Sequence, residues 1–234
     1  MSFSKYIPAP VIDQITDGVR VVVRMIIDRC RSDKLSDEDH ITGALTTLLE
    51  HHLEELSIEG IKIETKSFTL KEETATGADL GILLNVGIGS YRLSKAVIAQ
   101  AKKCECKYNK RFYDGNVRKN LLKQLENMLR ISPASFVLIY TRNYRCGIQV
   151  LPAADVLALD DSISCSEMNK LNSFAFPILF RYLLRCEIGD VKIARNFFGL
   201  EAIKRFAMEY RIRHSLLLKL TGWEKSTYDF FGSF

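Results

Sequence analysis

The chain has 234 residues, of which 47% are hydrophobic and 26% charged, and a formal net charge of +5. This balance excludes an intrinsically disordered chain, and the length suits one elaborated α/β domain better than two independent catalytic domains. No apolar stretch reaches the roughly 20 residues that a membrane span requires, and the N-terminus lacks the basic and apolar regions of a secretory signal. We therefore expect a cytoplasmic protein with no membrane partner.

The first third of the chain predicts two helices. The valine-rich run near the N-terminus fits either a strand or a helix, and we favour a helix over residues 15–30. A second helix is expected over residues 39–56, where leucines recur at helical spacing. Ser36 offers a cap for this helix, and Glu38 and Asp39 place acidic side chains in its first turn.

The middle of the chain predicts a sheet. Alternating and apolar runs indicate three consecutive strands, at residues 61–70, 78–86 and 93–102. A leucine-rich helix is expected next, over residues 115–130. Two further strands are expected after it, at residues 135–140 and 146–151.

After Asp160 the chain is expected to be mostly helical, around residues 168–186 and 198–220. We expect an N-terminal helical segment over residues 1–36 and a core over residues 37–160. A helical C-terminal extension, residues 161–234, is expected to pack on the core.

Three polar side chains are expected to meet at one edge of the sheet. Side chains alternate across a strand, so Gln100 and Lys102 face the same way. Asp79 opens the preceding strand directly after Gly77. If these two strands form an antiparallel hairpin, Asp79 lies opposite residues 100–102, and the three side chains converge.

Such a group suits phosphodiester hydrolysis. A carboxylate and an amide oxygen are hard ligands for Mg²⁺, and a neighbouring lysine can orient the attacking water and offset developing charge. Because Asp79 and Gln100 carry only one negative charge, a second carboxylate is wanted. Glu50, on the second helix, is our candidate, with a plain solvated side chain as an equal alternative. Other glutamates lie near enough to compete, namely Glu38, Glu54 and Glu73.

The segment Gly77-Ala78-Asp79-Leu80-Gly81-Ile82 is followed, 21 residues after Asp79, by Gln100-Ala101-Lys102. This pattern resembles the PD-(D/E)XK nuclease superfamily, and most of all the branch in which Gln replaces the acid of the third strand. The resemblance covers about residues 38–151. It implies a restriction-endonuclease-like core of helix, three-stranded meander, helix, strand and strand.

The resemblance also implies cleavage of DNA with Mg²⁺ or Mn²⁺. Asp79 and Gln100 would be metal ligands, Lys102 the catalytic lysine, and Glu50 the glutamate that several members carry on the helix. The resemblance also suggests a role in restriction or antiphage defence and a helicase or sensor partner. These two expectations rest on the resemblance alone. Symmetric oligomers are common among proteins, so a homodimer or a higher oligomer is expected.

Two departures from the family pattern leave a second hypothesis open. Ala78 stands in place of the proline that gives the family its name, and Gln100 in place of an acid. The first hypothesis is a Mg²⁺-dependent DNA endonuclease. The second is a nuclease-fold protein with a weakened metal site that acts as a nucleic-acid-binding or regulatory subunit. Taken alone, the Gly77-Ala78-Asp79 triplet is also typical of a simple turn.

A basic segment with interleaved aromatic residues follows the third strand. Such a segment suits a groove for the phosphate backbone of double-stranded DNA, with a solvated basic loop and helix face as the alternative. The predicted nucleic-acid contacts are Lys103, Lys107, Lys110, Arg111, Arg118 and Lys119.

Overall fold

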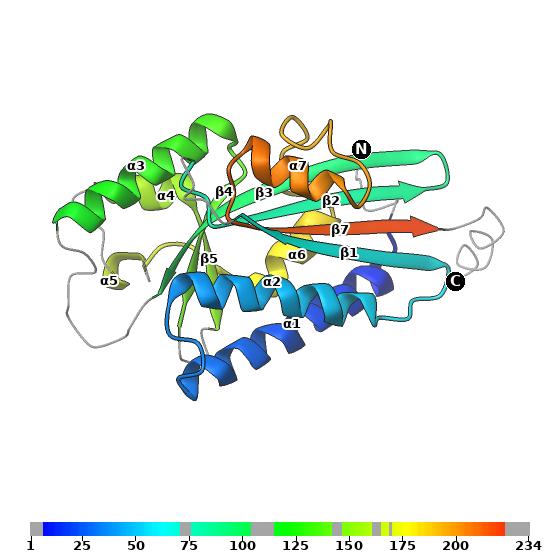
Figure 1. The fold of residues 1–234 in the computed structure, drawn as a ribbon, viewed down its shortest axis with the longest axis horizontal. Coiled ribbons are helices and arrows are strands. Elements are labelled where there is room, and N and C mark those ends of the chain that lie inside the picture. The colour runs from blue at the N-terminus through cyan, green and yellow to red at the C-terminus, as the bar shows by residue number, and fades with distance from the viewer. Residues whose placement is uncertain are drawn as a thin grey trace.

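The computed structural model describes residues 7–70, 76–103, 115–141, 147–160, 165–168 and 170–222. Within these ranges the strands form one mixed seven-stranded sheet (Figure 1). The strands are β1 (Ile61–Thr69), β2 (Leu80–Ile88), β3 (Tyr91–Lys103), β4 (Ser135–Tyr140), β5 (Ile148–Pro152), β6 (Phe174–Ala175) and β7 (His214–Gly222). Their order across the sheet is β1-β7-β2-β3-β4-β5-β6. The expected α/β class is therefore confirmed.

Helices cover both faces of the sheet (Figure 1). They are α1 (Ala9–Arg31), α2 (Glu38–Glu54), α3 (Gly115–Ile131), α4 (Ala153–Leu157), α5 (Cys165–Met168), α6 (Phe176–Leu184) and α7 (Ala202–Glu209). On one face of the sheet, a buried hydrophobic cluster includes residues of α1, α2 and α6. On the opposite face, a second cluster includes residues of α7, and a third includes residues of α3 and α4. In the described part of the chain, no helix combines the length and the apolarity needed to cross a bilayer.

The two N-terminal helices form where the sequence predicts them. In α1 the buried side chains recur at helical spacing, which settles the choice between strand and helix for this valine-rich run. In α2 the cap is Asp37 and not Ser36, because the Asp37 carboxylate accepts a hydrogen bond of 2.9 Å from the His40 backbone N–H. Glu38 and Asp39 occupy the first turn of α2, as expected.

The strands β2 and β3 pair antiparallel as the predicted hairpin, with Leu80 opposite Ala99. The next strand, β4, is parallel to β3, with Ile98 opposite Ser135. This arrangement fits a crossover through α3, because parallel neighbours cannot be joined by a tight turn. The expected strands at residues 135–140 and 146–151 correspond to β4 and β5.

The predictions for the C-terminal third are wrong in part. Residues 214–222 form the strand β7 and not the second half of a helix. Strand β7 lies between β1 and β2, antiparallel to the first and parallel to the second, so β1, β2 and β3 do not form a meander. Among the described residues between 170 and 186, a helix is present only over Phe176–Leu184, after the short strand β6. Residues beyond 160 thus help to build the sheet and are not a helical extension.

The error has a physical cause. A central strand buried on both faces shows no alternation, and a short apolar run of this kind cannot be distinguished from a buried helix by periodicity. The run that misled the prediction is fully buried in β7 on both sides of the sheet, at Leu216, Leu217, Leu218 and Leu220.

We expect β7 to be essential to the stability of the fold. Leu218 is 0% exposed, so Leu218→Ala should lower the free energy of unfolding by about 2–5 kcal/mol, through lost apolar burial and the cavity that remains. Denaturant unfolding monitored by circular dichroism measures this change. Met208→Ala on α7, where the side chain is 54% exposed, should change it by less than about 0.5 kcal/mol. Equal effects of the two substitutions would contradict the central position of β7.

Candidate active site

Asp79 lies at the entrance to β2, between the strands β3 and β7. Its backbone N–H donates to the Ala99 carbonyl at 2.9 Å, and its own carbonyl accepts from the His214 N–H at 2.9 Å. Its carboxylate oxygen Oδ2 accepts from Gln100 Nε2 at 2.5 Å and from the Ala101 backbone N–H at 2.9 Å. The carboxylate is therefore fixed against β3, directly beside the Gln100 side chain.

The glycine that precedes Asp79 is required by its conformation and by its neighbours. Gly77 has a φ of +79°, which favours glycine. A Cβ atom at this position would lie only 2.6 Å from Cβ of Gln124 on α3. Ala78, between Gly77 and Asp79, is completely buried. The turn that presents Asp79 is thus packed tightly against α3.

Gln100 leaves one polar atom without a partner. The side chain is only 2% exposed, and its Nε2 donates to Asp79 and, at 3.3 Å, to the Ala101 carbonyl. Its Oε1 is buried and accepts no hydrogen bond from the described residues. An unsatisfied buried acceptor costs about 1–3 kcal/mol, so this atom is a suitable ligand for a bound cation.

Lys102 is held by a glutamate of α2. Its Nζ lies 3.0 Å from Glu38 Oε2, and its side chain is only 12% exposed. The other carboxylate oxygen of Glu38 accepts from the Lys103 backbone N–H at 2.9 Å. Glu38 therefore docks the first turn of α2 onto the end of β3, at the same edge of the sheet as Asp79.

The structure does not bring Glu50 to this group. Glu50 accepts a hydrogen bond of 2.5 Å from the hydroxyl of Ser67 on β1. Strand β7 separates β1 from β2, which places Glu50 about two strand spacings, or roughly 10 Å, from the strand that Asp79 enters. Glu38 is instead the helix glutamate beside Lys102. The sequence signal that could have identified Glu38 was its position in the first turn of the helix. The first turn of α2 lies at this edge of the sheet, and the rest of the helix runs away from it.

The other two glutamates considered from the sequence lie elsewhere or are not described. The Glu54 carboxylate accepts a hydrogen bond from the Thr65 backbone N–H at 3.1 Å, on β1. Glu73 falls within residues 71–75, outside the described residues.

Burial raises the pKa of the Asp79 carboxyl from 3.8 to about 6. The positive charge of Lys102 and the Ala101 N–H oppose this shift, while the negative charges of Glu38 and Asp39 add to it. Above pH 6 Asp79 is therefore mostly ionised at a cost in folding free energy, which a bound positive charge would reduce.

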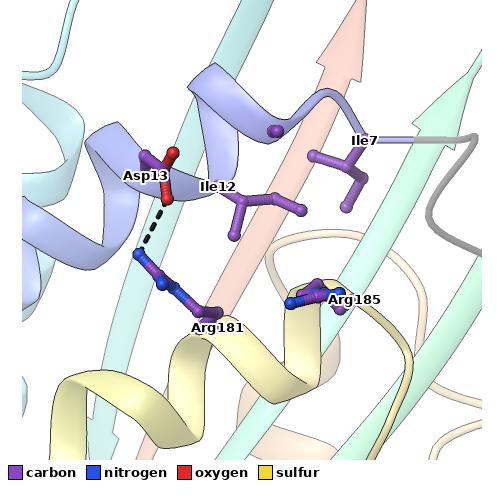
Figure 2. Close-up of a pocket in the computed structure, with 6 residues that line it drawn as sticks. Ile7, Ile12, Asp13, Arg181 and Arg185 are labelled. Atoms are coloured by element: carbon purple, nitrogen blue, oxygen red, sulfur yellow. Dashed lines mark hydrogen bonds and ion pairs between the residues drawn. The ribbon is translucent and has the colours of Figure 1, made fainter.

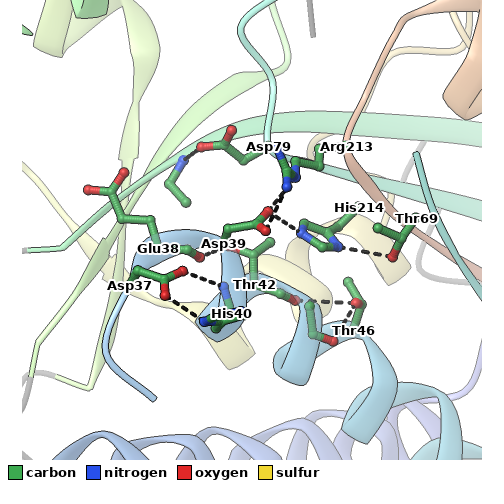
Figure 3. A network of polar contacts seen from close by, with 12 residues as sticks. Asp37, Glu38, Asp39, His40, Thr42, Thr46, Thr69, Asp79, Arg213 and His214 are labelled. Carbon is green, nitrogen blue, oxygen red and sulfur yellow. Dashed lines mark hydrogen bonds and ion pairs between the residues drawn. The ribbon is translucent and has the colours of Figure 1, made fainter. Parts of the chain in front are cut away.

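A second group of charged side chains adjoins Asp79 (Figure 3). Asp39 on α2 lies between Arg213 and His214, at the start of β7. Of these three residues, the sequence predicts a place only for Asp39, as an acidic side chain in the first turn of the second helix. No sequence signal indicated this group, because β7 was expected to be helical.

The predicted nucleic-acid residues have different outcomes. Lys119 is exposed on α3, Arg118 is partly buried, and Lys103 donates through Nζ to the Ser36 carbonyl at 2.8 Å. The remaining three, Lys107, Lys110 and Arg111, fall within residues 104–114, outside the described residues.

A separate pocket lies between α1 and α6, away from this group (Figure 2). Its volume is about 270 Å³, below the range of roughly 300–1,000 Å³ typical of small-molecule sites. The two arginines at its rim already have acidic partners. Arg181 pairs with Asp13 at 2.7 Å, and Arg185 pairs with Glu187 at 3.0 Å. We assign no function to this pocket.

Comparisons with models of protein families, with curated proteins and with solved structures found no match. Among the described residues, no three His, Cys, Asp or Glu side chains are grouped so that they could hold a metal ion. The donors that the site offers are one carboxylate, from Asp79, and one amide oxygen, from Gln100. A functional assignment therefore depends on the chemistry of these side chains.

The raised pKa of Asp79 predicts a pH-dependent gain in stability for Asp79→Asn in metal-free buffer. A raised carboxyl pKa favours the native state below pH 3.8, and this contribution is lost as the pH rises through about 6. Asparagine never takes on the buried charge. The stability of Asp79→Asn relative to the parent should therefore increase by about 2 kcal/mol between pH 4 and pH 7.5.

Denaturant unfolding at the two pH values measures this difference, and Asp37→Asn provides a control that should stay nearly constant. The His40 N–H lowers the pKa of the Asp37 carboxyl below its ordinary value of 3.8, so this acid loses its stability contribution only in more acidic solution. The stability of Asp37→Asn relative to the parent should therefore change little between pH 4 and pH 7.5. A flat difference for Asp79→Asn would show that its carboxyl is not destabilised by burial.

Proposed function

We propose that this protein is a cytoplasmic, divalent-metal-dependent DNA endonuclease. The observation that carries the proposal is the buried Gln100 Oε1, which has no hydrogen-bond partner among the described residues and belongs to the amide whose Nε2 donates to the Asp79 carboxylate. The resemblance of these motifs to PD-(D/E)XK nucleases supports the proposal. So does the chain order α2, β1, β2, β3, α3, β4, together with the parallel pairing of β3 and β4.

The donor set fits Mg²⁺ or Mn²⁺, because both ions accept carboxylate and amide oxygens. Asp79 and Gln100 would hold the ion, and its charge would compensate the buried carboxylate of Asp79. A bound ion of this kind polarises a phosphoryl oxygen and lowers the pKa of a coordinated water.

Lys102 is the proposed catalytic lysine. Its ion pair with Glu38 restricts the ammonium group to the edge of the sheet where Asp79 lies. In this position the lysine would orient the attacking water and offset the negative charge that develops on the phosphate. Glu38 would act as a positioning residue for Lys102, a different role from the one that the sequence prediction gave to Glu50, which was a further carboxylate for the metal site.

One feature favours the second hypothesis, a nucleic-acid-binding or regulatory subunit with a weakened metal site. Gln100 supplies no negative charge, so a cation would meet a single carboxylate in direct contact, from Asp79. The Oδ2 atom of that carboxylate already accepts two hydrogen bonds. Metal affinity therefore distinguishes the two functions.

We propose duplex DNA as the substrate because the chain is basic overall and α3 carries the exposed Lys119. Cleavage of both strands by one kind of site suits a symmetric dimer, in which two copies act on opposite strands.

Lys102→Ala should abolish metal-dependent cleavage of duplex DNA and retain most of the binding, because the substitution removes the group that acts on the water. Gel assays of linear and circular duplexes, with Mg²⁺, with Mn²⁺ and with a chelator, measure cleavage. Fluorescence anisotropy of a labelled duplex measures binding.

Lys219→Ala is a matched control for this experiment. Lys219 lies on β7 and pairs with Glu64 at 2.7 Å, so its substitution also removes a partly buried lysine–glutamate pair. This control should cleave like the parent. Equal cleavage by Lys102→Ala and the parent would rule out the proposed role of Lys102.

Gln100→Glu should bind Mn²⁺ at least tenfold more tightly than the parent, because it adds a second carboxylate to the site. Without metal it should melt at a lower temperature, since two carboxylates in hydrogen-bond contact repel each other. Isothermal titration calorimetry and thermal melting test both effects. Absence of Mn²⁺ binding by the parent, together with binding by Gln100→Glu, would favour the regulatory subunit over the nuclease.

A further inference from the structure

Arg213 contacts Asp39 through two nitrogens at the edge of the candidate active site (Figure 3). Its Nη2 donates a hydrogen bond to Asp39 Oδ2 at 2.8 Å, and its Nε lies 2.5 Å from Asp39 Oδ1 in an ionic contact without hydrogen-bond geometry. Together these contacts restrict the orientation of the planar guanidinium, a restriction that a lysine in the same place would lack.

Asp39 is in turn held by His214. The imidazole Nε2 lies 2.8 Å from Asp39 Oδ1, and Nδ1 lies 3.1 Å from the hydroxyl of Thr69 on β1. His214 is only 4% exposed, and a Cβ atom at Gly43 of α2 would lie 3.1 Å from its ring. The imidazole therefore connects α2, β7 and β1, and leaves the Asp39 carboxylate little freedom to move.

The backbone places this group directly beside Asp79. The His214 N–H donates to the Asp79 carbonyl at 2.9 Å, and the Arg213 N–H lies 3.4 Å from the Ala78 carbonyl. Arg213 is thus adjacent across the strands to the residue that would hold the metal.

The arginine retains the capacity to bind a further anion. Its contacts with Asp39 use Nε and Nη2, and Nη1 has no acceptor among the described residues. Its side chain is 36% exposed, so a ligand can reach it from solvent. An ion pair this exposed adds only about 0–1 kcal/mol to stability, so stabilisation alone is a weak explanation for the arrangement.

We propose that Arg213 binds a backbone phosphate of the nucleic acid, next to the bond that the site would cut. The guanidinium presents Nη1 in a fixed direction, which suits an anion with several oxygen acceptors. The nature of the ligand rests on the proposed function, but the phosphate contact itself does not require cleavage.

Arg213→Gln tests the phosphate contact through binding, in a Lys102→Ala background so that the duplex stays uncut. With a fluorescein-labelled DNA duplex and a fixed Mg²⁺ concentration, the Kd should rise about 5- to 20-fold. The slope of log K against log salt should fall by about one, because one phosphate contact is lost. Arg213→Lys should keep this slope, since its charge remains, and still bind more weakly than the parent because the planar guanidinium with its several N–H donors is lost.

Arg24→Gln in the same background is the control, because Arg24 is an exposed arginine on α1 and its substitution changes the net charge equally. It should leave the Kd and the salt slope unchanged. Thermal melting of each variant reports folding separately. If Arg213→Gln lowers the melting temperature but leaves the Kd and the slope at the parent values, Arg213 is only a bridge between α2 and β7. Absence of metal-dependent cleavage by the parent chain would count against the nuclease, whereas the salt slope decides the phosphate contact.

Discussion

The hydrogen bonds that hold Asp79 between β3 and β7 determine how the candidate site is built. Backbone contacts to Ala99 and His214 fix its main chain, and Gln100 with the Ala101 N–H fixes its carboxylate. The two backbone contacts fix where the acid enters the sheet, and turning its carboxylate away would break both of its hydrogen bonds to β3. The same packing removes it from solvent and raises its pKa to about 6. Burial of the ionised Asp79 carboxylate thus lowers the stability of the fold at this site, and a bound cation would restore that stability.

The first turn of α2 completes the arrangement. Two consecutive acids of this turn pair with different cations: Glu38 with Lys102, and Asp39 with Arg213. Consecutive residues of a helix point about 100° apart, so one turn can serve cations on two strands. The start of the helix also favours negative charge. The ion pairs with Lys102 and Arg213 therefore hold the start of α2 against the sheet, and they also fix the directions of these two cations.

The sequence predicts the local parts of this site better than the distant ones. Asp79, Gln100 and Lys102 could be placed together because they lie on a single hairpin, whose geometry follows from strand alternation. The choice of Glu50 over Glu38 could not be decided, because a helix period alone does not show where the helix docks on the sheet. Arg213 and His214 depended on β7, whose apolar run gives the same signal for a buried strand and a buried helix. Pairings across 145 residues, such as Thr69 with His214, have no local signature.

The late position of β7 in the chain has a consequence for biosynthesis. The strand that separates β1 from β2 is made of residues 214–222, so the ribosome releases it after every other strand of the sheet. Until then β1 lacks its neighbour and β2 has an open edge, which favours slow, late closure of the sheet. Arg213 and His214 arrive with the same segment. A nascent chain would therefore carry Asp79 and Lys102 without the residues that β7 brings to them, and the site would be complete only once residues 213–222 have been made.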